Sequence, residues 1–281
     1  MSVLTINKLT ASVGAEVTGV DPDRLAHDDG LATAVLDALE DNGILVFHGL
    51  NLGPEDQVSF CERLGEIDRS ADGHHPVSGI YPITLDKSKN KAADYLKASF
   101  VWHIDGCTPM HDECPQKATI LSAVQVARSG GQTEFANAYA AYETLGETEK
   151  QHYASLRVVH SLEASQRRVH PEPTEEQVQR WRARPTHENP LVWTHRNGRK
   201  SLVLGASADY IVGMDLDEGR TLLAELLEHA TTPEKVYSHT WSVGDTVIWD
   251  NQGVLHRAMP YEPNSQREML RTTVLGDEPI Q

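Results

Sequence analysis

The chain has 281 residues, of which 39% are apolar and 23% are charged, and this composition excludes a disordered, collagen-like or repeat-array protein. Its 41 Asp and Glu against 25 Lys and Arg give a formal net charge of −16, which would repel nucleic-acid phosphates and an anionic membrane surface. We therefore expect no nucleic-acid and no membrane partner, and an anionic ligand needs a local cluster of cations.

The cysteines and the first residues of the chain point to a cytoplasmic protein. Cys61, Cys107 and Cys114 form no C-x-x-C pair, so neither a disulfide framework nor a thiolate zinc site is expected. The first residues lack the basic and apolar regions of a signal peptide, and no apolar run approaches the ~18 residues of a membrane span.

The first part of the chain predicts a β-hairpin followed by two helices and a strand. Residues 4–18 contain two short strand-like runs around a glycine turn, and the apolar spacing over 30–39 predicts a helix that ends at Gly43. The apolar run 44–47 predicts a buried strand, and residues 54–64 predict the second helix.

Two irregular segments are expected to cover a site. Residues 68–99 are rich in Gly, Pro, Lys and Asp around one short strand at 79–85, which indicates a long active-site loop. Residues 163–190 form a second irregular insert, in which a helix start signal predicts a short helix over 174–182.

The remaining segments are mostly strand-like, with one clear helix over 217–229. The strand-like runs are 117–126, 156–159, 191–194, 201–204, 240–249 and 270–275. A mostly-β chain with flanking helices is the pattern that results. Because no internal repeat is visible, we expect a single domain over residues 1–281.

A metal-binding pattern lies in residues 100–106. His103 and Asp105 stand two positions apart in a β-prone stretch, so both side chains are expected on one face of a strand. The same spacing at residues 27–29 lies in a polar loop and is interpreted as solvated, whereas His103 has apolar neighbours and needs a partner. His256, after an apolar strand and an Asp-Asn-x-Gly turn, is the expected third ligand.

Two imidazoles and one carboxylate leave three coordination positions open, as in the facial triad that binds Fe(II) together with a co-substrate and O₂. Zinc hydrolases use similar ligand sets. The ligand types alone therefore leave both metals open, and a co-substrate site has to decide.

Such a site is expected after His256. Residues 266–273 alternate as a strand that returns antiparallel to the strand of His256, so Arg267 and Arg271 are expected on one face, roughly 13 Å apart at ~3.3 Å per residue. A guanidinium can bind a carboxylate through two parallel hydrogen bonds. A pair of solvent-facing arginines is the alternative.

In this order and spacing, the motifs resemble the taurine and phenoxyacetate dioxygenases, the TauD/TfdA group of Fe(II)/2-oxoglutarate oxygenases. The resemblance covers nearly the whole chain and rests on residues 14–21, Trp102–Asp105, Gly130–Thr133, Trp249–Asn251, His256–Ala258, Arg267 and Arg271. It implies a double-stranded β-helix, a jelly roll with flanking helices, which agrees with the strand-rich pattern.

The resemblance also implies an activity and the residues that serve it. The expected reaction is hydroxylation of a small organic acid, a carboxylate, sulfonate or sulfate ester on an apolar body, with Fe(II), 2-oxoglutarate and O₂, releasing succinate and CO₂. The implied site residues are His103, Asp105 and His256 for iron, Thr133 and Arg267 for the distal carboxylate of 2-oxoglutarate, and Arg271 and His75 for the anionic group of the substrate.

Departures from the family pattern bear on the substrate and on the alternatives. Ser78 and Ser99 stand where taurine-cleaving relatives carry Tyr and Asn, so we expect a larger or less polar substrate than taurine.

The alternative functions are less compatible with the residues present. Asp105 occupies the position that halide takes in related halogenases, which disfavours a halogenase. A zinc hydrolase would leave Thr133 and Arg267 without a role, and a non-catalytic metal-binding relative would be expected to have lost a ligand. The resemblance further implies a homo-oligomer, a dimer or a tetramer.

Overall fold

The computed structural model describes residues 4–70, 75–90, 93–110 and 114–281. Its largest sheet has seven strands in the order β1-β2-β3-β13-β5-β15-β4, and all neighbours are antiparallel except β2 and β3. The strands are β1 Thr5–Lys8, β2 Ala15–Thr18, β3 Ile44–Phe47, β4 Tyr81–Ile83, β5 Ala118–Gln125, β13 Thr246–Asp250 and β15 Glu268–Val274. The hairpin and the buried strand at 44–47 are confirmed.

A smaller sheet packs against one face of the large one. It has the order β12-β6-β14, with β12 Val236–His239, β6 Thr133–Asn137 and β14 Val254–Ala258. Phe135 and Val254 from this sheet share one buried apolar cluster with Val247, Trp249 and Met269 from the large sheet. Two facing antiparallel sheets with side chains packed between them form the predicted jelly roll.

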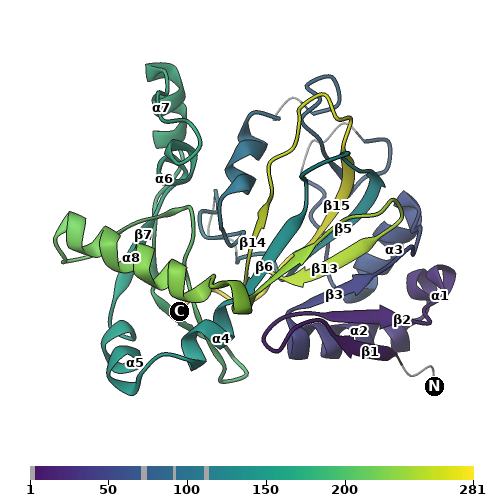
Figure 1. The fold of residues 1–281 in the computed structure, drawn as a ribbon, viewed down its shortest axis with the longest axis horizontal. Helices are drawn as coiled ribbons and strands as arrows, with labels where there is room; N and C mark the ends of the chain where they lie inside the picture. The colour runs from purple at the N-terminus through teal and green to yellow at the C-terminus, as the bar shows by residue number, and fades with distance from the viewer. Residues whose placement is uncertain (1–3, 71–74, 91–92, 111–113) are drawn as a thin grey trace.

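Three helices cover the outer face of the large sheet (Figure 1), namely α1 Pro22–His27, α2 Asp29–Asn42 and α3 Pro54–Leu64. The side chain of Asp28 caps α2 by accepting from the backbone N–H of Leu31, and Gly43 ends the helix with φ +74°. Both predicted helices are confirmed. The polar loop expected at His27 is instead the end of α1, although the imidazole is exposed as predicted.

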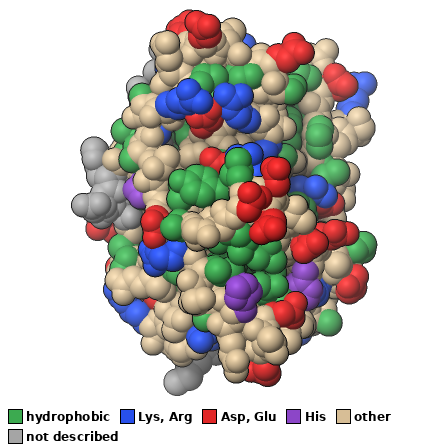
Figure 2. Space-filling model, turned by 90° about the vertical axis from the view of Figure 1, so that its left-hand side faces the viewer, with side chains coloured by type: hydrophobic (Ala, Val, Ile, Leu, Met, Phe, Trp, Pro, Cys, Tyr) green, Lys and Arg blue, Asp and Glu red, His purple; other side chains and the backbone are tan. Residues whose placement is uncertain are grey.

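The middle of the chain forms a layer beside the sandwich, on the left of Figure 1. Buried Trp193, Leu202 and Leu226 belong to its apolar core, and Figure 2 looks onto its outer face, where acidic and basic side chains surround a strip of apolar ones. Its elements are α4 Ala138–Glu143, α5 Glu147–Tyr153, β7 Arg157–His160, α6 Leu162–Arg167, α7 Glu175–Arg182, β8 His187–Pro190, β9 Val192–Thr194, β10 Lys200–Leu202, β11 Ala208–Ile211 and α8 Leu216–Ala230. They include the sheets β11-β7-β8 and β10-β9.

The insert 163–190 is more regular than expected. The predicted helix over 174–182 is confirmed as α7, whose Thr174 cap accepts from the N–H of Gln177. The insert also contains most of α6 and the strand β8, which pairs with β7. In residues 68–99, the predicted short strand is β4, and a 3₁₀ helix spans Tyr95–Phe100. A second 3₁₀ helix spans Pro233–Lys235.

The strand predicted over 240–249 is wrong in its first half. The small-sheet strand β12 ends at His239, and the large-sheet strand β13 begins at Thr246. Between them the chain turns, because Gly244 has φ +88° and the carboxylate of Asp245 accepts from the N–H of Ser242 at 2.9 Å. This connection crosses from one sheet to the other.

The predicted pairing of the last two strands is also wrong. β14 pairs with β6 in the small sheet, whereas β15 pairs with β5 and β4 in the large sheet. Arg267 precedes the first residue of β15, so it does not share a strand with Arg271. Arg267 therefore lies in the segment before the strand, and Arg271 lies within the strand.

The three cysteines are unpaired, as predicted. Among the residues that the structure describes, no helix is both long enough and apolar enough to span a bilayer.

Candidate metal centre and co-substrate site

His103, Asp105 and His256 converge on one point. Their ligand atoms all lie within 4.8 Å of one another, and in the described ranges no other group of three His, Cys, Asp or Glu residues is as compact. The Nε2 atoms of His103 and His256 each lie 3.8 Å from a different oxygen of Asp105. The structure thus brings together the three residues that the sequence indicated.

Backbone hydrogen bonds hold the two halves of this group together. The N–H of His103 donates to the carbonyl of His256 at 3.1 Å, and the N–H of His256 donates to that of His103 at 2.9 Å. The expected strand around His103 is only this single bridge, and Asp105 lies in the turn that follows. A sharp turn after the bridge, rather than strand alternation, therefore brings Asp105 next to His103.

The imidazoles are oriented by their second ring nitrogens. Nδ1 of His103 lies 2.8 Å from the carbonyl of Val101, and Nδ1 of His256 lies 3.4 Å from that of Val254. With Nδ1 donating to a carbonyl, the lone pair of each Nε2 faces the carboxylate. This is the orientation that metal-binding histidines commonly use.

The charges in this group suit a divalent cation. Burial and, to a smaller extent, the neighbouring His103 lower the pKa of His256 to about 3, so this imidazole is neutral at pH 7. Burial by itself raises the pKa of Asp105, but its electrostatic interactions with His256, His103 and Arg271 outweigh burial and hold that pKa below the usual value. An ionised carboxylate with neutral imidazole nitrogen fits Fe(II).

Arg267 is a buried cation close to the glycine turn before β6. It is 3% exposed, its Nη2 donates to the carbonyl of Gly131 at 3.2 Å, and its guanidinium lies over the ring of Tyr261 at 4.7 Å. Burial lowers its pKa, and none of the carboxylates that the structure describes pairs with it. A buried guanidinium of this kind favours an anionic ligand, because an unpaired charge is costly in a protein interior.

The glycine turn before β6 packs on Arg267, and the pairing of β6 with β14 places Thr133 close to His256. A Cβ at Gly131 would lie 3.0 Å from Nε of Arg267, so the arginine packs directly on this turn. Thr133 pairs with Ala258 across β6 and β14, two residues along the strand from His256. Thr133 and His256 therefore lie close together in the small sheet.

Arg271 reaches the metal group from the large sheet. Its guanidinium lies over the ring of Tyr81 at 5.0 Å, and its buried Nε has no hydrogen-bond partner among the described residues. Its charge acts on both Asp105 and His256. A donor without a partner at this place is available to an anionic substrate.

The structure does not bring His75 into this group. It is half-buried in its loop, and its Nδ1 accepts from the N–H of Val77 at 3.1 Å. The sequence reasoning in turn missed Trp241, whose indole N–H donates to Thr133, and Tyr261 beneath Arg267. Trp241 lies two positions after the last residue of β12, without any recognisable motif, so only the tertiary structure reveals its contact.

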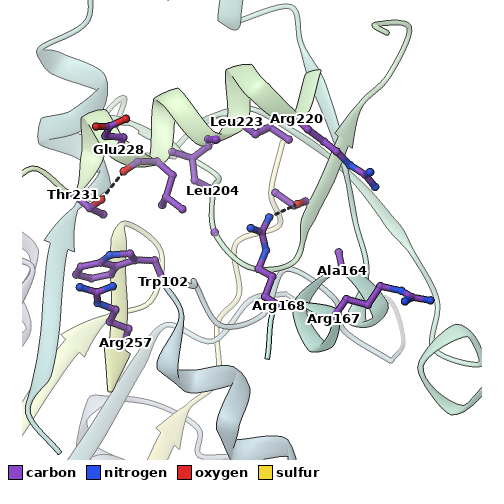
Figure 3. A pocket seen from close by; sticks show the side chains of 14 residues that line it. Trp102, Ala164, Arg167, Arg168, Leu204, Arg220, Leu223, Glu228, Thr231 and Arg257 are labelled. Carbon is purple, nitrogen blue, oxygen red and sulfur yellow. Dashed lines mark hydrogen bonds between the residues drawn. The ribbon is translucent and has the colours of Figure 1, made fainter. Parts of the chain in front are cut away.

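A cavity of about 740 Å³ lies on the other side of Trp102 and does not include the metal group (Figure 3). Arg168 points into it, held by the carbonyls of Ala206 and Ala208. Arg257 stacks on Trp102 at 4.6 Å and pairs with Glu134. This cavity is separate from the predicted site because Trp102 and Arg257 line it, whereas the adjacent His103 and His256 do not.

Comparison with known proteins agrees with this geometry. Residues 5–273 match the family model "Taurine catabolism dioxygenase TauD, TfdA family". The chain belongs to this family. TauD/TfdA membership confirms the resemblance, makes the protein a dioxygenase and confirms the jelly-roll fold.

Three known proteins are similar to this chain over nearly their whole length. The alpha-ketoglutarate-dependent 2,4-dichlorophenoxyacetate dioxygenase of Burkholderia sp. (strain RASC) is 36% identical over 273 residues, 90% of each chain. The (S)-phenoxypropionate/alpha-ketoglutarate-dioxygenase of Sphingobium herbicidovorans is 32% identical over 97% of this chain and 95% of that one. The crystal structure of AAD-2 with Mn(II) and N-oxalylglycine has a TM-score of 0.82 and 32% identity over 99% of this chain and 100% of that one.

Proposed function

We propose that His103, Asp105 and His256 hold one Fe(II) and that the protein hydroxylates a small organic acid while 2-oxoglutarate is converted to succinate and CO₂. The observation that carries this proposal is the compact group of two imidazoles and one carboxylate, with the buried, unpaired guanidinium of Arg267 packed beside the same small sheet. When bound, the iron supplies the redox chemistry with O₂ that no side chain provides.

The roles of the two residues proposed to bind 2-oxoglutarate follow from the hydrogen-bond donors on their side chains. Arg267 binds the distal carboxylate of 2-oxoglutarate, which neutralises the buried charge, and Thr133 adds a hydroxyl hydrogen bond. The zinc hydrolase alternative gives neither residue a function. A non-catalytic relative would not need the complete set of ligands that the structure brings together.

The prime substrate is an anion with an apolar body. Arg271 has a donor to spare once Arg267 holds the co-substrate, and the net charge of −16 means that a local cation has to attract an anion. Relatives named for phenoxyacetate and phenoxypropionate support a carboxylate, and sulfonates and sulfate esters offer the same acceptors. His75 is a second proposed contact of this anionic group.

The proposal extends to the whole protein. Residues 1–281 act as one domain, with the loop 68–99 and the insert 163–190 covering the site. The protein works in the cytoplasm as a homodimer or homotetramer, without a nucleic-acid or membrane partner. The three unpaired cysteines support a reducing compartment, and the net charge of −16 argues against binding to nucleic acid.

Spectroscopy and substrate-triggered succinate release test the proposal. Anaerobic Fe(II) with 2-oxoglutarate should give a weak visible charge-transfer band, and a panel of aryloxyacids, sulfonates, alkyl sulfates and N-acyl amino acids should reveal the substrate. Asp105→Ala, His103→Ala and His256→Ala should each remove the band and turnover. The exposed Asp29→Ala, from the second His-x-Asp pattern, should retain both. Normal turnover in Asp105→Ala would contradict the ligand assignment.

A further inference from the structure

Thr133 and Trp241 form a hydrogen bond inside the protein. The indole Nε1 of Trp241 lies 2.9 Å from Oγ1 of Thr133, and the two side chains are only 7% and 4% exposed. Thr133 is fixed on both sides, because it pairs with His239 of β12 and with Ala258 of β14. Its hydroxyl oxygen therefore has a defined position, and only the direction of its hydrogen remains to be set.

The donor inventory sets that direction. An indole N–H can only donate, whereas a hydroxyl has one hydrogen and two acceptor lone pairs. Because Trp241 donates to Oγ1, the hydrogen of Thr133 has to point away from the indole. We propose that Trp241 is a positioning residue that makes Thr133 a hydrogen-bond donor toward the distal carboxylate of 2-oxoglutarate. This inference rests on the proposed function, in which Thr133 and Arg267 bind that carboxylate.

The consequence is a pocket that presents more donors than acceptors to the end of the co-substrate. Arg267 has no acceptor atom, and Trp241 takes up one of the two lone pairs of Thr133, so this hydroxyl offers its hydrogen and only one remaining lone pair. A carboxylate offers only acceptors and satisfies both residues. A terminal amide would bring its own N–H groups against these donors, so the pocket favours 2-oxoglutarate over its 5-amide.

Trp241 is itself held in place. The ring of His239 meets the indole edge-on, with centroids 4.5 Å apart and an interplanar angle of 87°. His239 contacts the hydroxyl of Tyr237 through Nδ1 at 3.2 Å and the carboxylate of Asp245 through Nε2 at 3.3 Å. The same carboxylate accepts from Ser242 in the turn between the sheets. The indole therefore has little freedom to turn its N–H away from Thr133.

The experiment measures binding of 2-oxoglutarate to the Mn(II)-loaded protein by calorimetry, so that no turnover is needed. Trp241→Phe should raise the Kd roughly fivefold, and Thr133→Val should raise it roughly tenfold. If Trp241 acts through Thr133, the double variant should bind no more weakly than Thr133→Val alone. Trp193→Phe is the matched control, because that buried indole N–H has no hydrogen-bond partner among the described residues, and its Kd should equal that of the wild type.

A second substitution keeps the ring and removes only the donor. Replacing Trp241 by benzothienylalanine, which has sulfur in place of the N–H, should reproduce the fivefold loss even if Trp241→Phe unfolds. Both changes should also narrow the preference for 2-oxoglutarate over its 5-amide, because the freed hydroxyl of Thr133 can then accept from an amide N–H. A simple loss of packing would weaken both ligands equally.

The outcomes separate this inference from the proposed function. Additive losses from Trp241→Phe and Thr133→Val, or an unchanged Kd with benzothienylalanine, would overturn the positioning role while Arg267→Ala still weakens binding. If Arg267→Ala also left the Kd unchanged, the proposed co-substrate site itself would be wrong.

Discussion

Arg267 combines a permanent charge with an almost complete loss of contact with water, and its neighbours are a carbonyl and an aromatic ring. In Arg267→Ala the distal carboxylate of 2-oxoglutarate loses its charged partner, so binding should weaken by about 2–5 kcal/mol, the usual cost of truncating a buried charge pair. The KM for 2-oxoglutarate should rise accordingly. Arg128→Ala removes an exposed arginine near the same turn and should leave this KM unchanged.

Arg271 should decide which substrates are accepted. Its unpartnered Nε and its position near Asp105 suit a substrate anion. In Arg271→Ala, the ratio of kcat/KM for an accepted acid to that for its neutral amide should collapse, while the Kd for 2-oxoglutarate stays within about twofold, since no shared contact is lost. A wild-type protein that turns over acid and amide equally well would contradict anion recognition by Arg271.

The surroundings of His75 could not be predicted from the sequence. The meeting of His103, Asp105 and His256 could be predicted because an imidazole with apolar neighbours needs a partner once it is buried, and residues of these three types can share one cation. No comparable constraint applies to His75, whose ring satisfies a backbone N–H in its own loop. The partner of Thr133 was equally unpredictable, because Trp241 approaches it from the connection between β12 and β13.

The connection between β10 and β11 limits how the metal site can move. A Cβ at Gly205 would lie 2.8 Å from Cα of His103 and 2.9 Å from the carbonyl oxygen of Trp102, and the residue has φ +113°. Gly205→Ala should therefore displace the His103 backbone, destabilise the protein by about 1–3 kcal/mol and weaken Mn(II) binding. Urea unfolding and a metal titration measure the two effects.

Gly213→Ala is the matched control for this change. Gly213 has φ +78°, so an alanine there carries a similar backbone cost, but no atom lies within 4 Å of the added Cβ. Its metal affinity should remain that of the wild type. Equal losses of metal affinity in both variants would show that the close approach to His103 has no special effect.

Elements with strong local signals were predictable, and those defined by distant pairing were not. α2 has its apolar stripe, its Asp28 cap and Gly43, and β3 is a continuous apolar run. The strand β8 has the sequence His-Glu-Asn-Pro and exists because it pairs with β7 as an edge strand. The sequence likewise did not predict the strand β6 or the helices α4 and α5.

At the scale of the whole molecule, a buried histidine makes stability depend on pH. His160 in β7 is fully buried, and burial lowers its pKa to about 3, with His187 adding to the effect. Its usual pKa of about 6.5 returns on unfolding. Between these values the unfolded chain binds a proton that the folded protein excludes, so the stabilising contribution is complete above pH 6.5 and is lost as the pH falls toward 3.

His160→Gln should flatten this acid-induced loss by up to about 1.4 kcal/mol per pH unit below pH 6.5. The free energy of unfolding, measured in urea from pH 4.5 to 7.5, tests it. Gln retains a polar contact to Ser207, which His160 makes through Nδ1 at 2.9 Å. The exposed His152→Gln should keep the wild-type slope. A parallel pair of curves for wild type and His160→Gln would contradict the prediction.

The architecture as a whole followed from the sequence better than its connections did. A strand-rich chain with two predicted early helices indicated a mostly-β fold with flanking helices, because each apolar face has to be covered, and the family resemblance implied the jelly roll. The placement of β14 and β15 in opposite sheets could not be predicted, since the intervening residues 259–267 fit a tight hairpin as well as a crossing between sheets.

The two segments that meet at His103 and His256 are held by a single pair of backbone hydrogen bonds and lie far apart along the chain. A cation bound by both would act as a removable cross-link that exists only in the folded state. By mass action, a metal at 100 times its Kd should add about 2.7 kcal/mol to the free energy of unfolding, and the melting temperature should rise by several degrees. Since each further ligand that binds only the folded protein raises it again, a melting curve can rank acids before any turnover is detected.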